Sequence, residues 1–225
     1  MQEYALTFDQ LSLTVDDLYA EMGYGKNSPE EPVEQLVKEM LNEVALWVEP
    51  RCTYGLFAGK IEDDCVVLEN GTRFEVGATI AKLMHSSYRF ALFAATAGKR
   101  FQQYQERLKE EGDILKMFLA DIIGTCLAEK AGDRMELLLE QELAGERHTN
   151  RMSPGYCGWH LTGQKNLFAV VGGNPCGITL SEVCLMNPIK SISGVVGIGP
   201  EVNVKMYGCQ FCTLDTCYKR KMRKK

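Results

Sequence analysis

The chain has 225 residues, of which 45% are hydrophobic and 24% are charged, and its formal net charge is −5. These values lie close to globular averages, so they exclude a collagen-like, low-complexity or disordered protein and predict one main domain. Six Lys or Arg residues fall within 219–225, and the rest of the chain sets 19 basic residues against 30 acidic ones, a net charge of −11. Such an acidic protein is not expected to bind nucleic acid.

The sequence contains no signal for a membrane or for export. No apolar run approaches the ~20 residues that a membrane helix requires. Residues 1–14 lack the basic and apolar regions of a secretory signal. We therefore expect a cytoplasmic protein without a membrane partner, whose nine cysteines are thiols or metal ligands rather than disulfides.

The N-terminal part of the chain predicts two helices. An acidic amphipathic stretch between Thr14 and Gly23 predicts a first helix. Thr14 would be its N-cap, and Gly23 would be the residue after its C-terminus. Ser28 is expected to cap a second helix, with Pro29 at its first position. We treat residues 1–27 as a separate N-terminal helical segment.

The next part of the chain predicts strands and helices in alternation. An Asn-Gly pair between two strand-forming runs is typical of a hairpin. We expect, in order, a hairpin of 65–68 with 73–76, a short helix over 79–85 and a buried strand over 89–96. Charged residues dominate 99–111, which predicts an exposed helix.

Residues 113–143 form the longest periodic run and predict a helix that is buried on most sides. Gly124 and Gly132 interrupt it, and each glycine costs about 1 kcal/mol in a helix. We therefore expect another backbone or a ligand to approach closely there. Glu129 and Asp133 lie on the same helix, Asp133 directly beside Gly132.

After residue 148 the composition shifts to glycine, proline and small residues. The pattern predicts a helix over 162–171 and strands over 178–180, 183–186 and 191–198. Together with the preceding elements, this indicates an α+β protein with helices on a mostly antiparallel sheet.

The segment Arg151-Met-Ser-Pro-Gly155-Tyr156 combines residues that suit a small zwitterion. Arginine offers a planar fork to a carboxylate, and Pro-Gly makes a sharp turn that exposes backbone N–H groups. The ring of Tyr156 can face a cation or a flat group. An ordinary surface turn with an isolated arginine is the simpler interpretation of the same residues.

Three cysteines near the C-terminus are a candidate metal site. Cys209 and Cys212 have the spacing of metal ligands, and Cys217 as a third thiol suggests zinc or an iron–sulfur cluster. A fourth ligand is missing locally, and Cys176 or Cys184 could supply it only through the fold. Three free thiols near a chain end are the alternative.

An ordered series of motifs resembles the activation domain of vitamin B12-dependent methionine synthase, in the short stand-alone form of that family. The series is Arg151-x-x-x-Gly155-Tyr156, then Gly-Ile-Thr-Leu-Ser-Glu at 177–182, then Pro-Ile-Lys-Ser-Ile-Ser-Gly at 188–194. On this resemblance we assign 28–205 to an activation-domain-like domain and 206–225 to a Cys-rich basic tail.

The resemblance implies a twisted, mostly antiparallel sheet flanked by helices, with a site for S-adenosylmethionine (AdoMet) near the sheet. By the resemblance, Arg151 would meet the carboxylate of AdoMet and Asp133 its ammonium group. Gly155 and Tyr156 would shape the pocket for the adenosine and methionine parts.

The strand that borders the pocket in that family carries a Ser-x-Ser-Gly motif, which Ser191 and Ser193 match. These two serines are therefore further candidates for contact with AdoMet. Val196 stands where family members place an aromatic residue.

The resemblance also implies a function. AdoMet would donate its methyl group to cobalamin that has been oxidised to the cob(II) state, once an electron arrives. The cobalamin would belong to a separate B12-dependent methionine synthase or a related corrinoid methyltransferase, because 225 residues are too few for folate, homocysteine and cobalamin modules. The protein would thus be a component of a methyltransferase rather than a complete enzyme.

An alternative function comes from the cysteine triplet. The chain could carry zinc or an iron–sulfur cluster and dock a corrinoid partner without binding AdoMet.

Overall fold

The computed structural model describes residues 1–202. Its strands are β1 (Gln2–Ala5), β2 (Arg51–Glu62), β3 (Cys65–Leu68), β4 (Arg73–Glu75), β5 (Arg89–Thr96), β6 (Thr179–Leu180), β7 (Met186–Asn187) and β8 (Ser191–Ile198). Its helices are α1 (Phe8–Leu11), α2 (Val15–Met22), α3 (Val33–Ala45), α4 (Ala78–Leu83), α5 (Lys99–Glu111), α6 (Ile114–Leu143) and α7 (Gly163–Val170), with a 3₁₀ turn η1 (Pro175–Gly177).

The main sheet has six strands, and every neighbouring pair is antiparallel. Along the sheet the order is β4-β3-β2-β5-β8, and β1 pairs with the first residues of β2. β5 lies between β2 and β8 and is buried at seven of its eight positions. A strand that is covered on both faces needs apolar residues at consecutive positions, which explains the continuous apolar sequence of β5. β8 is an edge strand.

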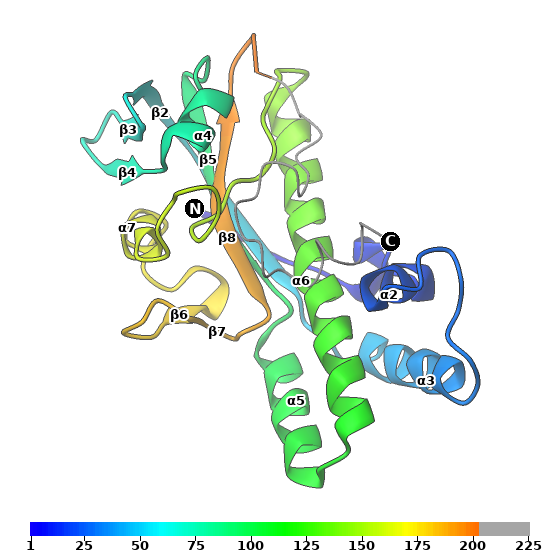
Figure 1. Cartoon of the computed structure of the whole chain (residues 1–225). Helices are drawn as coiled ribbons and strands as arrows, with labels where there is room; N and C mark the ends of the chain where they lie inside the picture. Colours follow the sequence, from blue (N-terminus) through cyan, green and yellow to red (C-terminus); the bar gives the residue numbers. More distant parts are fainter. Residues whose placement is uncertain (203–225) are drawn as a thin grey trace.

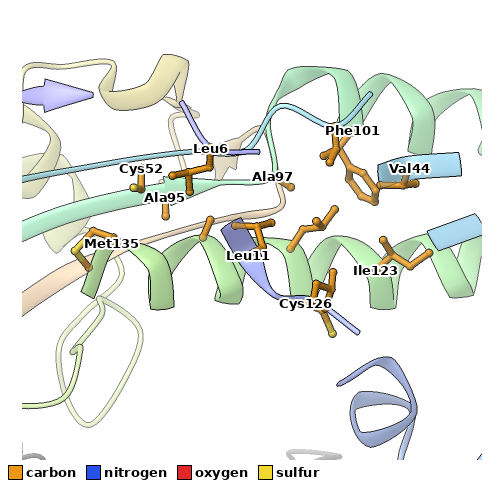
Figure 2. Close-up of a cluster of buried hydrophobic side chains, with 14 of the residues drawn as sticks. Leu6, Leu11, Val44, Cys52, Ala95, Ala97, Phe101, Ile123, Cys126 and Met135 are labelled. Atoms are coloured by element: carbon orange, nitrogen blue, oxygen red, sulfur yellow. The ribbon is translucent and has the colours of Figure 1, made fainter. Parts of the chain in front are cut away.

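Helices cover both faces of the sheet (Figure 1). The long helix α6 crosses one face, where α1, α2, α3 and α5 pack beside it, and Figure 2 shows the core between them. α4 and α7 cover the other face. Because side chains alternate along a strand, Phe93 and Val196 point to the α6 side, whereas Leu92 and Val195 point to the α7 side. Within residues 1–202, no helix has the length and apolar character needed to cross a bilayer.

The structure confirms the α+β fold class and most of the predicted elements. The buried strand β5 and the helix α5 have the predicted bounds, and Asp113 caps α6 by accepting a hydrogen bond from the Lys116 N–H. The hairpin of β3 and β4 and the helices α2 and α7 also lie where their patterns predict. Several of these segments have strong local signals, namely the continuous apolar run of β5, the Asn-Gly turn between β3 and β4, and the caps of α2 and α6.

Two predicted boundaries were wrong. α3 begins at Val33 rather than after Ser28, because Pro32 lies between them and the residue before a proline avoids the helical region. The predicted strand over 183–186 shrinks to β7, because Cys184 has a φ of 65° and its N–H donates to the Ser181 carbonyl in a turn.

The first 27 residues contribute more than helices. β1 adds a strand beside β2, and the short helix α1 follows it. Leu11 and Leu18 are buried against α6 in the same core as the sheet. The sequence analysis did not predict β1 or α1, which have four residues each and too short a pattern to be distinguished from a loop.

Candidate functional site

A cavity of about 370 Å³ lies beside the edge strand β8, between α6 and α7. Four of the predicted site residues line it, and so do residues from α7 and β7. Its lining includes Arg151, Tyr156, Gln164, Met186, Ser191 and Ser193. The predicted residues Asp133 and Gly155 do not line the cavity but contact or position residues that do.

The cavity exists because the outer edge of β8 is only partly covered. The segment that ends at Met152 runs along β8 and forms isolated β-bridges at His148–Ile198 and Met152–Val195. Met152 and Val195 exchange both backbone hydrogen bonds, at 2.9 and 2.8 Å. A Cβ at Gly194 would overlap the Met152 carbonyl, so this close pairing requires glycine there. After Met152 the chain turns away and leaves the start of β8 open.

The turn after Met152 aims Tyr156 at the cavity. The Tyr156 N–H donates to the Ser153 carbonyl at 3.2 Å, and the Gly155 N–H donates to the Trp159 carbonyl at 2.7 Å. Gly155 has a φ of 96°, a conformation that other residues rarely adopt, so its role is to permit the turn. The Tyr156 side chain is half exposed at the edge of the cavity.

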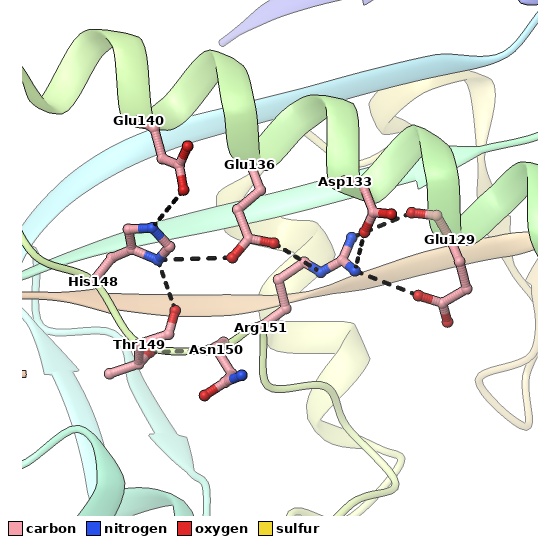
Figure 3. A network of polar contacts seen from close by, with 8 residues as sticks. All are labelled: Glu129, Asp133, Glu136, Glu140, His148, Thr149, Asn150 and Arg151. Carbon is pink, nitrogen blue, oxygen red and sulfur yellow. Dashed lines mark hydrogen bonds and ion pairs between the residues drawn. The ribbon is translucent and has the colours of Figure 1, made fainter. Parts of the chain in front are cut away.

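Arg151 is held by three carboxylates of α6 (Figure 3). Its Nη2 lies 2.7 Å from Asp133 Oδ1 and 3.5 Å from Glu129 Oε2, and its Nε lies 3.4 Å from Glu136 Oε2. These acids are four and three residues apart, so they share one face of the helix. The structure thus pairs the predicted carboxylate anchor, Arg151, directly with the predicted ammonium acceptor, Asp133.

Glycines in α6 make room for side chains that cross from β8 and the turn. A Cβ at Gly132 would overlap Arg151 Nη1 and Ile192 Cδ1, and a Cβ at Gly124 would meet the stem of Lys190. The expected close approach is therefore real, but side chains make it rather than a backbone or a ligand. Lys190 reaches over Gly124 to form an ion pair of 2.7 Å with Asp121.

A buried histidine extends the Arg151 network along α6. His148 Nε2 lies 3.1 Å from Glu140 Oε1, and its Nδ1 lies 2.8 Å from the Thr149 carbonyl and 3.7 Å from Glu136 Oε1. Burial raises the pKa of the Glu136 carboxyl, against the opposing attraction of Arg151 and His148. Glu136 therefore links the arginine and the histidine at a cost in desolvation.

The two predicted serines have different surroundings. The Ser191 hydroxyl lies 2.7 Å from the Pro188 carbonyl and 2.8 Å from Thr96 Oγ1, so it is engaged within the chain. Ser193 Oγ instead accepts a hydrogen bond of 3.2 Å from Gln164 Nε2. Val196 is fully buried on the α6 side of β8, in the core and not among the residues that line the cavity.

Gln164 is the site residue that the sequence analysis missed. It lies on α7, three and four residues before Leu167 and Phe168, which are both buried. A polar residue on the buried face of a predicted helix is a signal that could have identified it, since buried polar groups need partners.

The structure offers no support for a metal site in the part that it describes. Among residues 1–202, no group of three or more His, Cys, Asp or Glu side chains is arranged to hold a metal ion. The predicted ligands Cys209, Cys212 and Cys217 lie outside the described residues. Cys176 and Cys184, the suggested fourth ligands, are buried free thiols.

Comparison with known proteins identifies the family. A family profile described as the activation domain of vitamin B12-dependent methionine synthase matches residues 84–225, which contain β5, α6, α7, β8 and the whole cavity. The chain belongs to this activation-domain family.

A solved structure shares the fold of this activation domain. The crystal structure of the MetH reactivation domain bound to AdoHcy matches with a TM-score of 0.67 and 15% sequence identity, over 92% of this chain and 80% of that one. At this identity the likeness establishes the arrangement of sheet and helices. No curated protein matches the chain by sequence.

The close contact between Gly132 and Arg151 predicts that an alanine at position 132 lowers the stability of the protein, although alanine favours helices more than glycine does. We expect Gly132→Ala to destabilise the protein by up to about 2 kcal/mol, because overpacking costs about 1–3 kcal/mol and exceeds the gain in helix propensity of about 1 kcal/mol. Urea unfolding followed by circular dichroism measures this. Gln141→Ala, on an exposed part of α6, is the control and should change stability by less than about 0.5 kcal/mol. A more stable Gly132→Ala protein would contradict the contact.

The raised pKa of Glu136 predicts a pH-dependent stability. A carboxyl whose pKa is raised in the folded state binds its proton more tightly there than in the unfolded chain. The free energy of unfolding therefore falls as the pH rises from the pKa of the unfolded chain through the pKa of the folded state. We expect Glu136→Gln to raise the Tm at about pH 7 and to have a smaller effect as the pH falls toward about 4, because the wild-type carboxyl takes up its proton and no longer buries a charge. Thermal unfolding at the two pH values measures this.

The control is Glu110→Gln, at an exposed carboxyl of α5 that lies outside the network of Arg151 and His148. It should show a much smaller dependence on pH. A Tm difference for Glu136→Gln that is equal at both pH values, or that has the opposite sign at about pH 7, would show that the carboxyl is not destabilised by burial.

Proposed function

We propose that this activation domain binds AdoMet in the cavity beside β8 and presents the methyl group to cobalamin on a separate corrinoid protein, a B12-dependent methionine synthase or a related methyltransferase. Family membership and the AdoHcy-bound relative of the same fold support this proposal. The observation that carries it is the cavity, where Arg151 and Tyr156 meet the open end of β8.

The charges around the cavity suit AdoMet. Arg151 is set among three carboxylates, so the site has an excess of negative charge. AdoMet carries one carboxylate, an ammonium group and a sulfonium, hence a net positive charge. Its carboxylate can pair with Arg151 while its ammonium pairs with Asp133 or Glu129. The contact between Arg151 and that one acid is then exchanged for two ion pairs with the ligand, and the other acids can stay paired with Arg151. Hydrogen bonds between charged groups are the strong kind.

In this proposal the protein contributes binding and orientation. An external donor would supply the one electron that reduces cob(II)alamin to cob(I)alamin, and AdoMet would then give up its methyl group to the cobalt and leave as the thioether AdoHcy. Arg151 and the α6 acids fix the amino-acid end of AdoMet. The half-exposed ring of Tyr156 covers the ligand at the cavity edge and limits the access of water.

The alternative of a metal-carrying docking protein depends on Cys209, Cys212 and Cys217, none of which lies within the described residues. It requires no cavity at β8. The AdoMet proposal accounts for the cavity and its charges, and we therefore prefer it.

Calorimetric titration with AdoMet tests the binding step. We expect Arg151→Ala to weaken binding about 10- to 150-fold, because loss of a charge-assisted hydrogen bond costs about 1.5–3 kcal/mol. Arg107→Ala is the control, since this exposed arginine of α5 also pairs with a carboxylate, Glu43, but lies away from the cavity. No heat at millimolar AdoMet, or equal affinities in wild type and Arg151→Ala, would refute the proposed site.

Methyl transfer tests the functional step. Methyl-labelled AdoMet, a corrinoid methyltransferase holding cob(II)alamin and a one-electron reductant are mixed with the wild-type protein or with Arg151→Ala. The AdoMet concentration is set near the Kd of the wild-type protein for AdoMet. We expect label to appear on cobalamin only when the wild-type protein is present. Transfer that is equally fast without this protein would show that the partner does not need it.

A further inference from the structure

Gln164 is a buried polar side chain in the wall of the cavity. It is 3% exposed and lies on the face of α7 that packs against the sheet. Its neighbours on that face, Leu167 and Phe168, are apolar and buried. A glutamine in this position loses its contact with bulk water, so each of its polar atoms needs a partner.

Only one end of the Gln164 amide has a partner. Nε2 donates to Ser193 Oγ at 3.2 Å, and Ser193 is itself 1% exposed on β8. Oε1 is buried and accepts no hydrogen bond from any of residues 1–202. Gln164 also lines the cavity, so a small rotation of its side chain would let Oε1 accept a hydrogen bond from an N–H or O–H donor of a ligand there.

The open edge of β8 offers backbone groups beside this amide. Val195 and Gly197 direct their N–H and C=O away from β5, toward Met152 and Thr149. Successive residues of an antiparallel strand alternate in direction, so Ser193 also directs its N–H and C=O outward, beside the cavity. The α7 side of the cavity thus presents neutral donors and acceptors in a row.

The two sides of the cavity differ in charge. Arg151 and Glu129 provide the charged groups at α6, whereas Gln164 and Ser193 are neutral and lie among apolar residues such as Met186. An ammonium group is stabilised by the α6 carboxylates and not by a neutral buried amide. The donor that fits Oε1 is therefore neutral. AdoMet offers two kinds, the ribose hydroxyls and the exocyclic amine of adenine, and the apolar residues around Gln164 suit the flat base better than the polar ribose.

We propose that Gln164 is a specificity-determining residue that accepts a hydrogen bond from the 6-amino group of adenine, and that Ser193 is a positioning residue that fixes the Gln164 amide. This inference rests on the proposed binding of AdoMet and names the part of the ligand that the α7 side recognises. A 6-oxo purine places an acceptor opposite Oε1, so the site discriminates against it.

Titration with two thioethers tests this inference. The probes are AdoHcy and S-inosylhomocysteine, which differ only along one edge of the base: the 6-amino group and the acceptor N1 of adenine are replaced by a 6-oxo group and an N1–H. We expect the wild-type protein to bind AdoHcy about 10- to 100-fold more tightly, the range expected when a buried polar group is left unsatisfied. Gln164→Met, of similar length, should bind AdoHcy about 10-fold more weakly and reduce the preference to within about 3-fold.

Matched variants separate a local effect from a loss of folding. Gln141→Met makes the same substitution at an exposed glutamine of α6 and should keep the wild-type affinities. Ser193→Ala removes the hydroxyl that holds the amide and should also reduce the preference for AdoHcy, which a purely structural role would leave unchanged. If Gln164→Met fails to fold by circular dichroism, the preference of Ser193→Ala decides the question.

The outcomes distinguish this inference from the proposed function. If wild type binds AdoHcy and Arg151→Ala weakens it, but Gln164→Met or Ser193→Ala keeps the wild-type preference, the role of Gln164 is refuted and AdoMet binding stands. If the wild-type protein binds neither thioether nor AdoMet, the proposed function and the inference both fail.

Discussion

The ion pairs of Arg151 with the carboxylates of α6 hold the site together. A guanidinium that is mostly buried must have counter-charges, and α6 supplies them from Glu129, Asp133 and Glu136 on one face. Gly132 leaves the space in which this contact forms. The contact ties the segment that precedes the turn to α6, so the turn begins at a defined point and leaves the start of β8 open as a cavity wall.

The cavity follows from the antiparallel order of the sheet. β8 is an edge strand, and the returning segment pairs with it only from Val195 onward. Native proteins usually cover such an edge or place charged residues on it, whereas here the uncovered part lies between a charged helix face and a neutral one. Arg151 and Gln164 mark these two sides. A zwitterionic nucleoside has the same division into a charged end and a neutral, flat end.

The fold and the site differ in how far the sequence predicts them. Arg151 and Tyr156 could be singled out because they belong to one short motif whose residues are close in sequence, whereas Ser193 was a candidate only by resemblance. Asp133 was implied by resemblance, but its 2.7 Å contact with Arg151 was not predicted, because the two residues lie on different elements. Gln164 was missed because its meaning depends on Ser193, 29 residues away on β8.

The sequence by itself determined the local structure of this activation domain. Apolar periods, caps and turns predicted β5, α5 and α6, since these signals act between residues a few positions apart. Tertiary structure alone decided that Gly132 faces Arg151, that three acids share one guanidinium and that the Gln164 amide ends in the cavity wall. Such contacts depend on how α6, α7 and β8 pack, and packing brings together side chains whose local patterns carry no information about one another.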